Sequence, residues 1–87
     1  MKTFFLKQFR KKYSKRIKPI ENLDKRFIQR YQLFIRNRED PILKDHALTG
    51  DLKGFRAFWV AGDIRVVYYI MEDIAYFVDI GSHNQVY

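Results

Sequence analysis

Cysteine is absent from this chain of 87 residues, and proline and glycine are scarce, with two and four occurrences. Without cysteine there is no disulfide framework, no thiolate zinc site and no cysteine nucleophile. No stretch approaches the roughly 20 apolar residues that a membrane-spanning helix needs. The apolar run at the start is shorter than a signal peptide and leads directly into basic residues. These absences favour a single domain over residues 1–87, in the cytoplasm and without a membrane anchor.

Positive charge, in contrast, is abundant and unevenly distributed. Lysine and arginine number 17 against 10 acidic residues, which gives a net charge of +7. Residues 1–45 hold 14 basic and 5 acidic side chains, whereas residues 46–87 hold 3 and 5. A basic surface of this density favours a polyanionic partner, nucleic acid first and an acidic protein second. The alternative is that these side chains only solvate the exposed faces of helices.

The first half of the chain has helical periodicity. Residues 7–17, and a second segment from residue 21 or 22 to about residue 37, place apolar side chains three and four positions apart. Pro19 ends the first helix, because the residue before a proline is disfavoured in helical geometry. Residues 3–6 precede the helices as a short strand. The aromatic side chains of both helices are expected to lie in the core, with the basic side chains on the opposite faces.

Three β-strands are expected in the second half, over residues 55–61, 64–71 and 74–80, which are rich in aromatic and β-branched side chains. Gly62-Asp63 and Glu72-Asp73 separate them, and connections this short join antiparallel neighbours. The expected fold is α+β, in the order β-α-α-β-β-β. It is a twisted antiparallel sheet with a helical hairpin packed on one face, followed by a polar tail without a helix.

The two turns also predict which side chains meet across the strands. A two-residue turn at Glu72-Asp73 places Arg65 opposite Ile80. His83, three residues further on, then lies near Asp63 and Arg65, although His83 and Asp63 are 20 positions apart in the sequence.

The corresponding register about Gly62-Asp63 pairs Val60 with Arg65 and Arg56 with Tyr69. Side chains alternate between the two faces of a sheet, so Arg56 and Arg65 are expected on one face, roughly 13 Å apart. A shift of one residue in register would undo this arrangement.

Histidine is the side chain that changes charge near neutral pH, as general acid–base catalysis requires, and the chain has two. His46 lies in a predicted loop, where an ordinary surface histidine is the more common outcome. His83 lies just beyond a strand and is predicted to be near Arg65 and Asp63. Two histidines and scattered carboxylates lack the spacing of metal-binding motifs, so we expect no metal and no cofactor.

A histidine, an arginine and a tyrosine close together can cleave RNA without a metal. A base removes the proton of the ribose 2′-OH, which then attacks the adjacent phosphorus. A guanidinium stabilises the charge that grows on the phosphoryl oxygens, and an acid protonates the departing 5′-oxygen. The residues permit this reaction but do not require it.

Four stretches of the second half carry a resemblance to a known family. They are DHALTG at residues 45–50, LKGFR at 52–56, DIRVVY at 63–68 and GSHNQVY at 81–87. Together they resemble the RelE-like toxins of bacterial toxin–antitoxin pairs. The YafQ type is the most similar branch, with its Asp-His-x-Leu-x-Gly loop and Gly-x-His-x-x-x-aromatic ending. The basic helical hairpin is similar in kind, but not residue by residue.

This resemblance implies a metal-independent endoribonuclease that cuts mRNA on the ribosome and is held inactive by a cognate antitoxin, expected to wrap the toxin with an acidic segment. His83 is the implied general acid, and His46 or Asp63 the implied base. Arg65 stabilises the phosphate in the transition state, and Tyr87 orients the reaction or stacks on a base. Arg56 matches a phosphate-contacting position of the wider family. From the basic charge we also expect Lys53, Lys11, Lys12 and Lys15 to bind RNA.

Two positions depart from the YafQ-type pattern. Trp59 replaces a second histidine on the strand, and Ala57 replaces an acidic residue. Two alternatives to the ribonuclease stay open, and these departures keep the second of them open. One is a toxin of the same fold that poisons DNA gyrase without catalysis. The other is an inactive relative that only binds RNA or the antitoxin.

Overall fold

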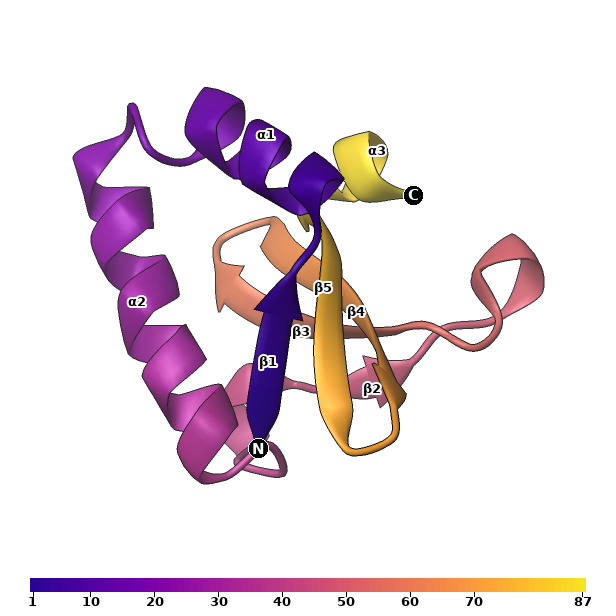
Figure 1. The fold of residues 1–87 in the computed structure, drawn as a ribbon. Coiled ribbons are helices and arrows are strands. Elements are labelled where there is room, and N and C mark those ends of the chain that lie inside the picture. Colours follow the sequence, from indigo (N-terminus) through magenta and orange to yellow (C-terminus); the bar gives the residue numbers. More distant parts are fainter.

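The computed structural model describes all of residues 1–87. Its elements are β1 (Lys2–Phe5), α1 (Lys7–Arg16), α2 (Glu21–Arg36), β2 (His46–Ala47), β3 (Arg56–Ala61), β4 (Ile64–Met71), β5 (Ile74–Gly81) and α3 (His83–Val86), as Figure 1 shows. Single turns of 3-10 helix at Pro41–Leu43 and Gly50–Leu52 flank β2. No helix combines the length and the apolar character needed to cross a bilayer.

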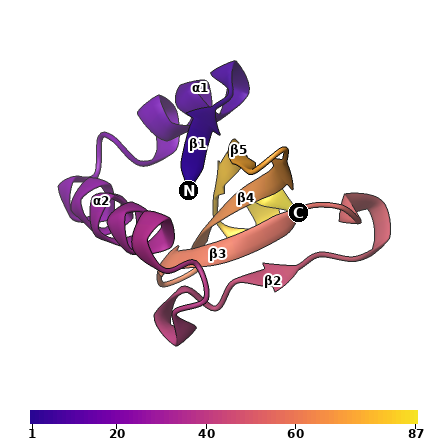
Figure 2. The same cartoon turned by 60° about the horizontal axis from the view of Figure 1, so that its bottom comes forward.

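The strands form one sheet in the order β1-β5-β4-β3-β2 (Figure 2). The expected meander of β3, β4 and β5 is antiparallel throughout, which confirms the prediction from the two short turns. β1 pairs with β5 in parallel, so the sheet is mixed rather than antiparallel at every pair. β1 and β5 are far apart in the sequence, with both helices and three strands between them. No tight turn therefore fixes their relative direction, as it does in a hairpin. The α+β class and the order of the predicted elements are confirmed.

Both helices pack on one face of the sheet around the ring of Phe77. The rings of Phe5, Phe9, Tyr31, Phe34, Phe58 and Tyr68 lie with their centroids 5.0 to 6.1 Å from that of Phe77. Most of these side chains are fully buried, as is Ile17 near the end of α1. Tilted and edge-on ring pairs add to the free energy of burial. The aromatic stripes of the helices are therefore core, as the sequence predicted.

The register between β4 and β5 begins as predicted, with Met71 opposite Ile74. An irregularity then shifts it by one residue, because Val67 faces Asp79 and Tyr68 faces Phe77, which leaves Val78 as an extra residue in β5. Arg65 consequently faces Gly81 instead of Ile80.

A second irregularity lies between β3 and β4. Trp59 faces Arg65 and Ala61 faces Ile64, so Val60 is the extra residue, and Arg56 faces Tyr68 instead of Tyr69. Because Tyr68 is buried against the helices, Arg56 points to the helix-covered face, whereas Arg65 points to the other face. The prediction that both arginines share a face is therefore wrong, for the reason that a one-residue shift reverses every side chain.

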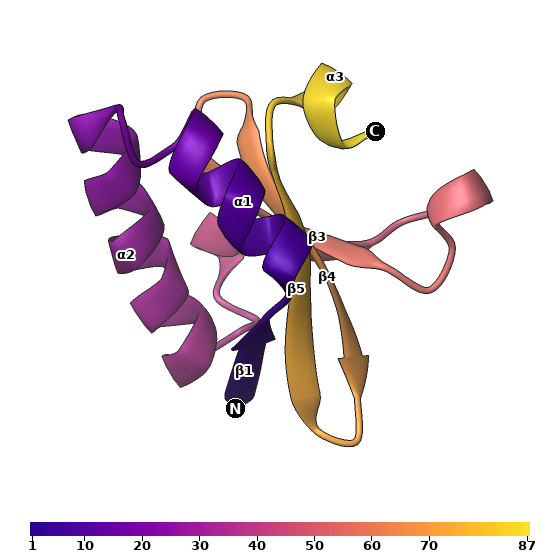
Figure 3. The ribbon, with the colours of Figure 1, turned by 45° about the horizontal axis from the view of Figure 1, so that its top comes forward.

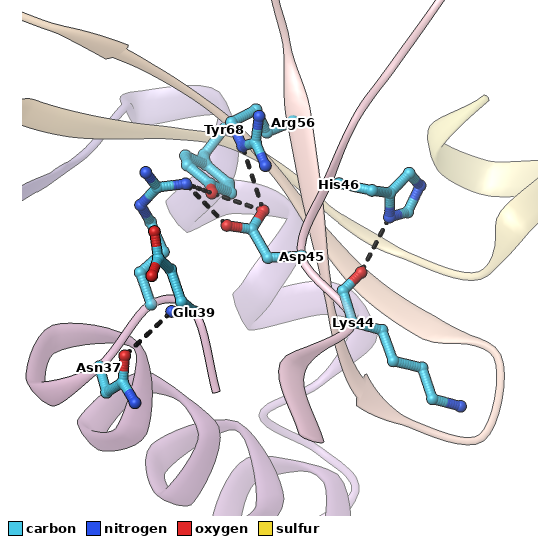
Figure 4. Close-up of polar contacts among 8 residues, drawn as sticks. Asn37, Glu39, Lys44, Asp45, His46, Arg56 and Tyr68 are labelled. Atoms are coloured by element: carbon cyan, nitrogen blue, oxygen red, sulfur yellow. Dashed lines mark hydrogen bonds and ion pairs between the residues drawn. The ribbon is translucent and has the colours of Figure 1, made fainter. Parts of the chain in front are cut away.

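The loop that leads into β2 is fixed by the carboxylate of Asp45 (Figure 4). One oxygen accepts hydrogen bonds from Tyr68 Oη at 2.7 Å and Arg56 Nε at 3.3 Å, and the other accepts from Arg38 at 2.8 Å. The Asp45 side chain is only 5% exposed. A buried carboxylate with two arginine partners and a phenol is well compensated, and it holds the next residue, His46, in place.

Burial raises the pKa of the Tyr68 phenol to about 12, and its hydrogen bond to Asp45 contributes in the same direction. Between about pH 10, where an unfolded tyrosine titrates, and pH 12, the folded state keeps a proton that the unfolded state has lost. The free energy of unfolding should therefore fall as the pH rises through this window. Urea unfolding of wild type and Tyr68→Phe at a series of pH values checks this. Identical pH dependence in the two proteins would contradict it.

The turn between β4 and β5 offers a test of backbone strain. Glu72 and Asp73 both adopt left-handed conformations, with φ of 52° and 67°. Such a turn favours Asn-Gly, and a left-handed conformation costs an ordinary residue about 1 kcal/mol or more. Replacing the pair by Glu72→Asn and Asp73→Gly should raise the free energy of unfolding by roughly 1 kcal/mol, or Tm by about 4–8 °C. Glu72→Gln, which removes the charge alone, is the control and should change Tm little in a thermal melt.

Candidate active site

The segment after β5 forms the short helix α3, which corrects the expectation of a polar tail. Ser82 begins it with a capping box, in which the backbone N–H of Ser82 donates to Oε1 of Gln85 at 2.8 Å. The spacing of Ser82 and Gln85 is the sequence signal for such a helix start. Because α3 starts two residues after Gly81, the helix fixes His83 close to the end of the sheet.

Four of the residues expected from the sequence meet at this end of the sheet: His83, Asp63, Arg65 and Tyr87. Oδ1 of Asp63 accepts a hydrogen bond from Arg65 at 2.8 Å, and Oδ2 accepts one from the backbone N–H of His83 at 3.1 Å. The imidazole ring of His83 lies edge-on to the Tyr87 ring, with centroids 4.8 Å apart. Asp63 thus links the β3–β4 turn to α3.

Arg65 lies at the centre of this cluster. Its guanidinium is 5.4 Å from the centre of the Tyr87 ring, and one terminal nitrogen is 3.4 Å from Nδ1 of His83. Its Nε is buried and has no hydrogen-bond partner. An unpaired buried donor is unfavourable, and because this Nε is shielded from solvent, the terminal nitrogens are the donors that a ligand can reach.

The contact with Arg65 favours one tautomer of His83. A guanidinium only donates hydrogen bonds, so this contact suits the neutral ring in which Nδ1 accepts and Nε2 carries the proton. The His83 side chain is exposed, and Nε2 is the ring atom free to meet a substrate. The hydrogen bond is long, and an anion that attracts Arg65 can replace it.

His46 lies apart from this cluster on β2. It pairs with Ala57, which pairs with Val67, and Arg65 is two residues from Val67 on the same strand. His46 and Arg65 therefore share a face of the sheet, about 12 Å apart between Cα atoms. Nδ1 of His46 is 2.9 Å from the Lys44 carbonyl, and Figure 4 shows the ring pointing away from the side occupied by Asp45.

A small apolar floor separates His46 from the His83 cluster. Ala57 and Val67 lie between them in the register, and both are buried, at 0% and 3% exposure. The two exposed histidines are thus separated by buried apolar side chains of β3 and β4.

Trp59 does not take the place of a strand histidine in this cluster. Its indole N–H donates to the Gly62 carbonyl at 2.8 Å, and Arg30 and Lys44 each lie 5.0 Å from the centre of its ring. The indole is engaged in cation–π contacts and holds no proton for transfer.

The residues expected to bind RNA lie in three places. Arg56 is bonded to Asp45 on the helix-covered face, and Lys53 is on the loop that projects from the body of the molecule (Figure 1 and Figure 3). The remaining three lie together on α1, in a groove of about 770 Å³. The lining side chains are Gln8, Lys11, Lys12, Lys15, Arg16, Ile20, Leu23, Ile64 and Gln85. Since Gln85 is in α3, the groove reaches the helix that carries His83.

Comparison with known proteins agrees with this fold. A toxin from Helicobacter pylori, in a copper-bound mutant form, has 29% identity and a TM-score of 0.79 over 100% of this chain and 99% of its own. A mutant of YafQ from E. coli has 22% identity and a TM-score of 0.81 over 98% and 96%. YafQ in the E. coli DinJ–YafQ complex has 23% identity and a TM-score of 0.78, also over 98% and 96%.

The two E. coli structures support the fold alone, because their identity is low. No curated protein matches the chain. The model of one family, described as the bacterial toxin of type II toxin–antitoxin systems, YafQ, matches residues 1–87. The match spans the whole chain, including both helices and the cluster around His83, and the protein therefore belongs to the YafQ family of bacterial type II toxins.

Proposed function

We propose that this toxin is an endoribonuclease that cuts mRNA on the ribosome by attack of a ribose 2′-OH on the adjacent phosphate. The observation that carries the proposal is the cluster of His83, Arg65, Asp63 and Tyr87. It combines an imidazole ring, a guanidinium and an exposed aromatic side chain within hydrogen-bond or ring contact. These groups match what cleavage of a phosphodiester requires, and the chemistry needs no metal.

The roles follow from the positions of the polar atoms. Arg65 turns its donors to the phosphate, where they stabilise the charge of the transition state. This movement frees Nδ1 of His83 to take up a proton from solvent, and the ring then donates the proton on its exposed Nε2 to the departing 5′-oxygen as the general acid. Tyr87, with 41% of its surface exposed, orients His83 and offers a face to a nucleobase.

The base is better assigned to His46 than to Asp63. In-line attack places the base and the acid on opposite sides of the phosphorus. Both oxygens of Asp63 are bonded on the His83 side of the site, which suits a positioning role. His46 lies across the apolar floor on the same face, about 12 Å from Arg65 between Cα atoms, so a phosphodiester fits between the two histidines.

The groove on α1 supplies the affinity for RNA in this proposal. The cations of Lys11 and Lys15 have no ion-pair partner, and the groove that they line extends to Gln85 beside the site. A phosphate backbone gains most of its binding free energy from such cations. The same surface suits an acidic segment of a cognate antitoxin, as a counterpart to the DinJ partner of E. coli YafQ.

His83→Ala should abolish mRNA cleavage in a cell-free translation reaction, with a loss of about 10²- to 10⁴-fold, because general acid catalysis is lost. Primer extension maps the new 5′ ends. Asn84→Ala, an exposed neighbour on α3 outside the cluster, is the matched control and should cleave like wild type. Circular dichroism and thermal melting verify the fold of both variants.

A His83→Ala protein that cleaves at the wild-type rate would rule out this mechanism. Intact mRNA with well-folded wild type would rule out the ribonuclease itself. Inhibition of gyrase supercoiling by wild type and by a variant without both histidines would then favour the gyrase poison. Binding of RNA or antitoxin without either effect would favour the inactive relative.

Lys11→Gln and Lys15→Gln, made in the non-cleaving His83→Ala protein, should each weaken binding of a labelled single-stranded RNA. The slope of log K against log salt concentration should fall in magnitude by about 0.7 for each lost phosphate contact. Arg36→Gln removes an equally exposed charge about 20 Å along α2 from the groove. It should leave the slope unchanged, and equal effects of all three substitutions would refute a localised RNA site.

A further inference from the structure

Arg16 joins helix α1 to the end of β5. One of its terminal nitrogens donates to Oδ1 of Asp79 at 3.2 Å and to the backbone carbonyl of Ile80 at 2.9 Å. The Arg16 side chain is only 23% exposed, so solvent competes little for these bonds. The guanidinium thus holds a backbone position three residues before His83.

Asp79 strengthens the contact between Arg16 and the end of β5. Its residue surface is 9% exposed, and its carboxylate also accepts from Lys12 at 3.1 Å and from the backbone N–H of Ile80 at 2.8 Å. Lys12 and Arg16 are one helical turn apart on α1, so both reach the same carboxylate. A buried carboxylate with two cationic partners and a backbone donor resists displacement, because breaking it leaves an uncompensated charge.

Gly81 transmits the attachment to α3. A Cβ at this position would lie 2.6 Å from Oε1 of Gln85 and 2.9 Å from the terminal nitrogen of Arg16. Arg16 and the capping side chain of α3 therefore close around the same backbone position, and a Cβ there would require both side-chain ends to shift. Gly81 also faces Arg65 across the sheet, so one short segment determines where both Arg65 and His83 lie.

From this geometry we infer that Arg16 is a positioning residue for the site, which sets His83 relative to Arg65 through Asp79 and Gly81. The inference rests on the proposed ribonuclease for its functional consequence. Arg16 and Gln85 of α3 both line the groove on α1, so Arg16 connects the proposed RNA surface to the helix that carries the reacting histidine. Figure 1 shows α1 and α3 at the same end of the sheet. A second residue of α1 that binds Asp79 allows the positioning role of Arg16 to be separated from a general effect on stability.

Lys12 is the matched control for Arg16. Both residues bind the Asp79 carboxylate from the same helix, but only Arg16 reaches Ile80 and the Gly81 position. The chain has only two histidines, and His46 is on β2, away from this attachment, so its resonance is an internal reference. Proton–carbon spectra of the two imidazole rings can therefore report a local change at His83 in the folded protein.

Arg16→Gln should shift the His83 ring resonance by more than its line width and leave that of His46 in place, whereas Lys12→Gln should move neither. Arg16→Lys, which retains a cation for Asp79, should restore part of the wild-type position. In the translation reaction at saturating protein, Arg16→Gln should lower the maximal cleavage rate by about 10- to 100-fold, as expected for a displacement on the order of 1 Å. The protein concentration for half-maximal cleavage should change far less.

A second variant keeps the inference testable if Arg16→Gln unfolds. Gly81→Ala leaves every charge in place and should displace the Gln85 cap, with the same selective shift of His83. Unshifted His83 resonances in both variants, or wild-type cleavage by folded Arg16→Gln, would overturn the positioning role. If wild type cleaves no RNA, the proposed function fails, and the resonances alone still decide whether Arg16 positions His83.

Discussion

The pairing of Arg65 with Gly81 at the ends of β4 and β5 is the constraint on which the rest of the site depends. It places the guanidinium beside the segment that enters α3, two residues before His83. Asp63, just ahead of β4, then receives both the guanidinium and the first N–H of α3. With the register predicted from the turn alone, Arg65 would face Ile80, and its guanidinium would be displaced by one residue relative to α3. The extra residue Val78 in β5 therefore sets the register that assembles the site, although the Val78 side chain does not belong to the site.

Hydrophobic periodicity and turn residues were sufficient to predict both helices, the three-strand meander and the proximity of His83 to Asp63 and Arg65. They were insufficient where one extra residue is absorbed inside a strand. Val60 and Val78 look like any other strand residue, so nothing in the sequence marks the shift that sends Arg56 to the opposite face from Arg65. The contact of Arg16 with Asp79 joins residues 63 positions apart, and only the packing of α1 against β5 brings them together.

The positive charge that dominates the composition is divided between two tasks. Asp45 binds Arg38 and Arg56, and Asp79 binds Lys12 and Arg16, so these cations hold loops and helices onto the sheet. A count of basic residues therefore overstates the surface that is free for a polyanion. Arg56 illustrates this, because a motif match suggests a phosphate contact while the structure gives the guanidinium a buried carboxylate as its partner.

The two departures from the YafQ-type pattern, Ala57 and Trp59, change which side chains near the histidines can exchange a proton. Ala57 contributes only to the apolar floor, and the Trp59 ring is held between Arg30 and Lys44. No strand side chain between the histidines can therefore carry a proton. In the ribonuclease proposed above, proton transfer would then pass directly between the substrate and each histidine, and this requires that both rings be held in position. Asp45 fixes the loop that enters β2 with His46, and Arg16 contacts the backbone that leads into α3 with His83, so each suits this requirement at one of the two histidines.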